Sequence, residues 1–147
     1  MFKKSDLLTN SFTMEFPEIN YWAVLVSALA FFAIGSLWYS PVLFAKAWIK
    51  ELGMTKEIME KSNMAKTFGV SFLLMLIMAF NLAAFIGNGM GVQFGATAGA
   101  LTGIGWVALA IGINYLFERK SFRIWLINAG YMAVSFTVMG AIIGAWQ

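Results

Sequence analysis

The side chains that could do chemistry within the apolar parts of this sequence are amides, hydroxyls and aromatic rings. Asn81, Asn114 and Asn128 each interrupt a long uncharged run. An amide at membrane depth can hydrogen-bond a neighbouring helix, or several amides can line a path for an uncharged or weakly polar solute. No carboxylate, lysine, arginine or histidine lies within these runs, which argues against ion-coupled transport through a charged group.

A second group of such residues is Trp38-Tyr39-Ser40-Pro41, followed by Trp48. Pro41 ends or kinks a helix, and the Ser40 hydroxyl is placed to satisfy a carbonyl that the proline frees. The aromatic rings are suited to a membrane interface. Two interpretations stay open: a well-made helix end, or a small pocket formed by these residues.

The composition excludes several classes of chemistry. The 147 residues include no cysteine and no histidine, so disulfides, thiolates, zinc sites and histidine acid–base catalysis have no residue to use. Every acidic residue lies in a tail or connecting segment, so paired catalytic carboxylates do not converge. We therefore expect no catalytic residue, no metal site and no cofactor, and a protein that is not an enzyme. The basic residues do not form an aromatic-interleaved face, so no nucleic-acid partner is expected.

The elements that must position these residues are transmembrane helices. Hydrophobic residues make up 61% of the chain and charged residues 12%, which is too few charges to cover such an apolar surface in water. The uncharged runs are long enough to cross about 30 Å of hydrocarbon. The fold class predicted is all-α, an integral membrane four-helix transmembrane bundle, with spans at about 20–41, 64–86, 93–117 and 122–146.

The second and third spans come from one uncharged run, 67–117, which must fold back because one helix of that length would overshoot a bilayer. Gly87-Asn88-Gly89-Met90-Gly91 supplies the turn. Residues 1–18 are predicted to be a polar tail and 19–147 the membrane domain. Met14 is an alternative start.

The link 42–63 has apolar residues at helical spacing and is predicted to hold a short amphipathic helix at the membrane surface that ends at Gly53. Asn20 and Thr55 are candidate N-caps of the first span and of a second short helix. The link is either a solvated connector or a docking surface for anionic lipid or a partner.

Lysine and arginine predict the orientation. Eight of the ten basic residues lie between the first uncharged run and the second, which begins at residue 67, or near 119–123, and the Gly-rich turn has none. Both basic loops are expected in the cytoplasm and both termini outside it. Most tryptophans lie near span ends, as interfacial belts require. Trp106 lies mid-span, so it is expected to pack inside the bundle.

Small residues give the strongest packing pattern. Glycines recur every fourth residue and form one face of the third span, and a second pair does the same on the fourth. These faces pack either within one subunit or between subunits of a homo-oligomer. The glycines concerned are Gly95, Gly99, Gly103, Gly140 and Gly144.

Residues 35–41 (GSLWYSP), with Leu43-Phe44 and Lys46-Ala47-Trp48 after them, closely resemble the first-helix signature of domain of unknown function (DUF) family 1761, a bacterial membrane family. Residues 126–131 (LINAGY), followed by Met139-Gly140, resemble that family's closing helix. The resemblance covers the chain from about Ile19. It implies four spans and a bacterial inner membrane, and it gives no activity, so no catalytic residue is carried over.

Two functions are consistent with the sequence. The first is a structural or accessory membrane component that self-associates and meets membrane lipid or an unknown protein partner. The second is an oligomeric channel or facilitator for a small uncharged or weakly polar solute, lined by the three asparagines.

Overall fold

A computed structural model describes residues 18–146, and the predicted tail up to residue 17 with its alternative start lies outside them. This part of the chain is made of helices and short connections. The helices are α1 (Tyr21–Trp38), α2 (Ala45–Leu52), α3 (Lys56–Glu60), α4 (Met64–Ile86), α5 (Gly91–Ala100), the π-helix η1 (Leu101–Ala108), α6 (Leu109–Phe117) and α7 (Phe122–Trp146).

Four helical segments are long and apolar enough to cross a membrane: α1, α4, the continuous helix from Gly91 to Phe117, and α7. The predicted all-α transmembrane fold class is therefore confirmed. α4 and α7 have the bounds expected from the sequence. The third span begins at Gly91 rather than near residue 93, because the helix starts directly after the glycine turn.

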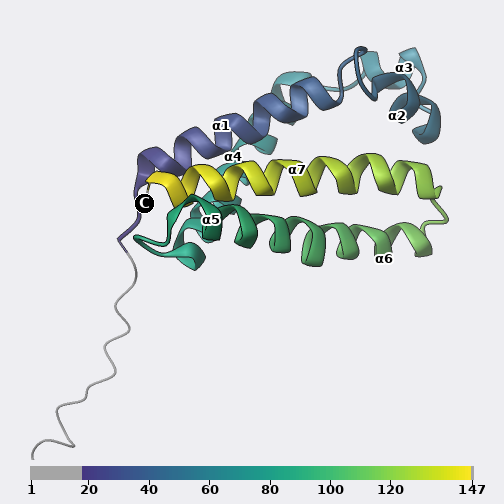
Figure 1. Cartoon of the computed structure of the whole chain (residues 1–147). Helices are drawn as coiled ribbons and strands as arrows, with labels where there is room; N and C mark the ends of the chain where they lie inside the picture. Colours follow the sequence, from purple (N-terminus) through teal and green to yellow (C-terminus); the bar gives the residue numbers. More distant parts are fainter. Residues whose placement is uncertain (1–17, 147) are drawn as a thin grey trace, which may run out of the picture.

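α7 is the central helix. The segment α5–η1–α6 runs antiparallel along it, and α1 and α4 pack against it from other sides (Figure 1). Phe31, Met139 and Ile143 are among the fully buried side chains where α1 and α7 meet. A central position explains why α7 carries the largest buried share of the four spans.

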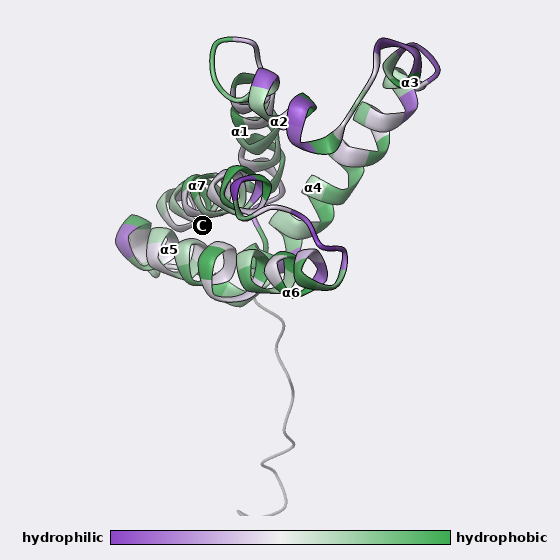
Figure 2. Cartoon of the chain, turned by 90° about the vertical axis from the view of Figure 1, so that its right-hand side faces the viewer, coloured by the Kyte–Doolittle hydropathy of each residue, from purple (hydrophilic) through white to green (hydrophobic). Residues whose placement is uncertain are grey.

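The two ends of the bundle differ in charge. α2, α3 and the 118–121 connection lie at one end, whereas the glycine turn and Trp146 lie at the other (Figure 1). Figure 2 views the first of these ends, and the hydrophilic colour gathers there on α2, α3 and the adjoining loops. This end, called the basic end below, carries the two basic loops together, as four antiparallel spans require.

Local capping follows the sequence. The Asn20 side chain accepts hydrogen bonds from the amides of Trp22 and Ala23, so it is the N-cap of α1. Its Nδ2 also donates to the Trp146 carbonyl at 2.9 Å, which ties the start of α1 to the end of α7. Gly53 ends α2 with a φ of 62°, a conformation that glycine adopts without strain.

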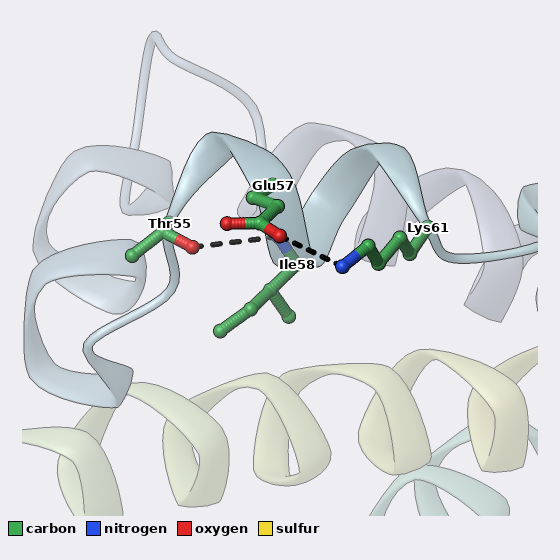
Figure 3. Close-up of polar contacts among 4 residues, drawn as sticks. All are labelled: Thr55, Glu57, Ile58 and Lys61. Atoms are coloured by element: carbon green, nitrogen blue, oxygen red, sulfur yellow. Dashed lines mark hydrogen bonds and ion pairs between the residues drawn. The ribbon is translucent and has the colours of Figure 1, made fainter.

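The short helix α3 is held by its own side chains (Figure 3). Thr55 accepts a hydrogen bond from the Ile58 amide at 3.4 Å, and Lys61 pairs with Glu57 at 2.7 Å. Both charged side chains are mostly exposed, so the ion pair contributes little to stability.

Backbone packing between α5 and α7 is the closest helix contact. A Cβ built on Gly95 would collide with the Gly140 carbonyl, and one on Gly99 with the Phe136 carbonyl. The same holds for Gly144 against the Gly91 carbonyl. Both predicted glycine faces are therefore used against each other within one chain, the first of the two alternatives.

The third span contains a feature that the sequence did not predict. Its middle, η1, is π-helical, and a π-segment shifts the faces of the helix that follows it. Trp106 lies in η1 and is 76% exposed on the outside of the bundle. The prediction that Trp106 packs inside was wrong, because the inner face of this helix is taken by glycine and alanine against α7.

α4 contacts the core mainly through its second half. Its fully buried residues, Ala79, Leu82, Ala83 and Ile86, all lie there. Its first turns are exposed, although the Phe32 ring of α1 makes edge contacts with Phe68 and Phe72. α4 therefore offers a large apolar surface to its surroundings.

The glycine contact predicts a strong effect of a single methyl group. Gly140→Ala should lower the free energy of unfolding by about 2 kcal/mol or more, because the new Cβ meets a backbone carbonyl that cannot move aside. Unfolding in mild detergent measures this. Gly69→Ala is the matched control, since a Cβ there has no neighbour within 4 Å, and it should be neutral or slightly stabilising. Equal stability of the Gly140→Ala and Gly69→Ala variants would contradict the close backbone contact between α5 and α7.

Candidate functional site

The candidate site lies at the basic end and is built on one asparagine. The Tyr39 hydroxyl donates to Asn128 Oδ1 at 2.8 Å, and Asn128 Nδ2 donates to the Tyr115 hydroxyl at 2.7 Å. These three residues, the tyrosine–asparagine cluster, come from the end of α1, from α7 and from α6. One amide therefore joins three helices with both of its polar atoms.

α1 is fixed to α7 beside this cluster by an indole. Trp38 Nε1 donates to the Ile127 carbonyl at 2.9 Å, and the Trp38 ring packs over Gly130. One helical turn earlier, Gly35 leaves room for the Tyr131 ring. Between α1 and α7 the small residues thus make room for aromatic rings. Between α5 and α7 they allow the two helix backbones to touch.

The residues of the predicted signature pocket are partly packed into the bundle and partly exposed. The Tyr39 ring makes edge contacts with Trp48 of α2 at 5.5 Å and with Tyr131 at 5.2 Å between ring centroids. Trp38 and Tyr39 therefore pack inward, with Trp48 against the Tyr39 ring and Phe44 against the Trp38 ring. Pro41 is exposed. The site is a filled aromatic cluster around the tyrosine–asparagine cluster.

The Ser40 side chain differs from expectation. Its buried Oγ has no hydrogen-bond partner among the described residues, so it does not bond a carbonyl freed by Pro41. The Ser40 backbone carbonyl serves the turn, because it accepts from the amides of Leu43 and Ala45 at 3.1 and 3.2 Å. The backbone alone closes this helix end.

The three predicted asparagines do not converge. Asn128 is half-buried in the cluster, which is the interhelical pairing expected of it. Asn81 on α4 and Asn114 on α6 are exposed on the outside of the bundle, and neither side chain has a hydrogen bond within residues 18–146. They do not line a common path through one subunit.

The chemistry that this arrangement supports is neutral hydrogen bonding. Two phenols and one amide contain no acid–base pair, and no group of three potential metal ligands occurs among the described residues. Glu51 is a carboxylate of the basic end that already has partners: it accepts a hydrogen bond from the Ser121 hydroxyl and lies 3.9 Å from Arg123. This pair joins α2 to the start of α7.

Sequence reasoning missed several partners at this site. Tyr115, Ser121 and Trp125 gave no motif, although each makes a contact between helices. Trp125 Nε1 donates to the Ala108 carbonyl at 2.9 Å, where π-helical hydrogen bonding gives way to α-helical. Their position near the ends of the third and fourth spans, opposite each other across one short loop, was the only signal.

These features are those of a multi-pass α-helical membrane protein in which Asn128 and the indoles of Trp38 and Trp125 make neutral hydrogen bonds between the spans. The family model described as "Protein of unknown function (DUF1761)" matches residues 22–144, and the chain belongs to this family. The resemblance expected from residues 35–41 and 126–131 is therefore confirmed. No curated protein and no solved structure matches the chain significantly.

The tyrosine–asparagine cluster predicts a coupled effect. Tyr39→Phe and Tyr115→Phe should each lower the free energy of unfolding by about 1 kcal/mol, because each removes one interhelical hydrogen bond. In an Asn128→Leu background both substitutions should have little further effect, since the shared partner is gone. Unfolding in detergent measures the cycle.

Asn114→Leu is the control for the Asn128 substitution. Its amide has no partner within the described residues, so the same chemical change should leave stability unaltered. Additive losses in the double variants would show that the two tyrosines act independently of Asn128.

Proposed function

We propose that this protein is a structural or accessory component of the membrane that self-associates into a homo-oligomer. The observation that carries the proposal is the exposed amide of Asn81. It lies five residues before the end of α4, about 8 Å along the axis and inside the hydrocarbon. An amide without a partner is costly there, and a second helix can supply one.

The surroundings of Asn81 suit a helix–helix contact. Leu74, Ile77 and Phe85 lie at spacings of three and four residues around Asn81, and all are at least half exposed. They form one stripe on α4, called the Asn81 face. An asparagine has a donor and an acceptor, so two copies of this face can bond each other about a two-fold axis.

The glycine faces are not available for this contact, because α5 and α7 cover each other within the chain. Self-association is therefore proposed through α4. The channel alternative gains no support from the asparagines, because Asn128 bonds two tyrosines inside the chain whereas Asn81 and Asn114 are exposed on two other helices. The proposed role requires neither enzymatic activity nor a nucleic-acid partner.

The Asn81 face predicts a loss of association on a single substitution. Asn81→Leu should weaken dimerisation in lipid nanodiscs or mild detergent by roughly tenfold, the effect of removing about 1 to 2 kcal/mol of interhelical hydrogen bonding. Photobleaching or mass measurement over a dilution series gives the dissociation constant. Asn114→Leu, the same change within a turn of the end of α6, should leave it unaltered. A wild-type monomer at all concentrations would overturn the proposal.

We also propose an orientation in a bacterial inner membrane, with the basic end in the cytoplasm and both termini outside. The support is that eight of the ten lysines and arginines belong to the segments of the basic end, with four of the seven acids.

A tag placed after Gln147 tests this orientation. It should be modified by a membrane-impermeant reagent added to intact spheroplasts, and a tag in the link at Gly53 should be protected. Labelling of the Gly53 tag alone would show the opposite orientation and overturn the proposal.

A further inference from the structure

A groove of about 700 Å³ opens between α6 and the first turns of α7 at the basic end. Its walls are apolar and include Ile113, Leu116, Phe122 and Trp125. The first three of these side chains are more than half exposed, so they face whatever fills the groove. Lys120 lines it next to the connecting loop.

The groove is held open by two features. Gly112 has no side chain to fill it, and a Cβ there would lie 2.9 Å from Trp125 Nε1. The Trp125 ring is fixed, because its Nε1 donates to the Ala108 carbonyl at 2.9 Å and its ring packs on Phe122 at 5.1 Å. The wall therefore cannot close by a simple change of rotamer.

The loop beside the groove is cationic. Residues 118–123 contain three basic side chains and one carboxylate. Within the described residues Arg119 and Lys120 have no ion pair, whereas Arg123 lies near Glu51. Lys120 and Arg119 are therefore free to bind an anion at the level where α6 and α7 leave the membrane.

Tyr115 also lines the groove and carries a polar group. Its hydroxyl accepts from Asn128 Nδ2, so the hydroxyl proton remains to be donated. An ester carbonyl or phosphate oxygen is a suitable acceptor. The tyrosine–asparagine cluster thus shares Tyr115 with the groove and keeps one phenol proton to donate.

We propose that this groove binds one anionic phospholipid, with an acyl chain against Ile113 and Leu116 and the phosphate at Lys120 and Arg119. The occupant must be apolar along its length and anionic at one end, and it must enter from the membrane. A phospholipid has these properties, and basic pockets between transmembrane helices recognise anionic headgroups in this way. The proposal does not depend on the Asn81 face, which lies on another helix.

Titration with two lipids of the same acyl chains tests the site. Phosphatidylglycerol or phosphatidylcholine is added to delipidated full-length protein in mild detergent, and native mass spectrometry counts bound lipids. Phosphatidylglycerol should give one adduct at lower concentration than phosphatidylcholine. Lys120→Gln should weaken phosphatidylglycerol binding roughly fivefold and reduce the difference between the lipids.

Lys56→Gln is the matched control, because it removes the same charge from an exposed position on α3 outside the groove. It should change binding less than twofold. Ile113→Trp, which fills the groove from an exposed position, should abolish the adduct. Equal binding of the two lipids, or unchanged binding in Lys120→Gln, would overturn the proposal. So would a dimer that Ile113→Trp dissociates, which would assign the groove to a second copy.

Discussion

The backbone contact between α5 and α7 is the constraint on which the rest of the structure depends. In lipid there is no hydrophobic driving force for helices to associate. Close van der Waals packing between them must supply much of the stabilisation. Gly95 and Gly99 meet Gly140 and the Phe136 carbonyl without any side chain between them. This places α7 at the centre and leaves its remaining faces to α1 and α4, whose buried residues pack against it.

The same contact explains why the basic end is different. Towards α6 an aromatic ring replaces the backbone contact: Trp125 of α7 lies against Gly112, and its indole donates to the Ala108 carbonyl. The π-helical turns of η1 lie at this transition. The tyrosine–asparagine cluster and the apolar groove both lie beyond it, so close packing at one end of α7 is matched by hydrogen bonding and open space at the other.

The polar groups divide into two kinds. Inside the bundle, Asn20, Trp38, Trp125 and Asn128 bond between helices and need no charge. Outside it, the amide of Asn81 is exposed, at a place where a membrane around α4 would offer it no water. A bundle with an exposed amide on its outer face, unpaired among the described residues, is suited to assembly with another helix, and the loops of the basic end are suited to a charged membrane surface.

The sequence by itself determined the four spans, most of their ends and the fact that the basic loops share one end of the bundle. These depend on local properties: apolar length, capping side chains such as Asn20 and Thr55, and the charge of each segment. It also indicated that α5 and α7 each have a face lined by small residues. Only the tertiary structure decided that these faces meet each other, that Trp106 points outward and that Asn128 bonds two tyrosines. Periodicity shows which residues share a face of one helix, but the partner of that face is set by how all four helices pack together, with the π-segment changing the register midway.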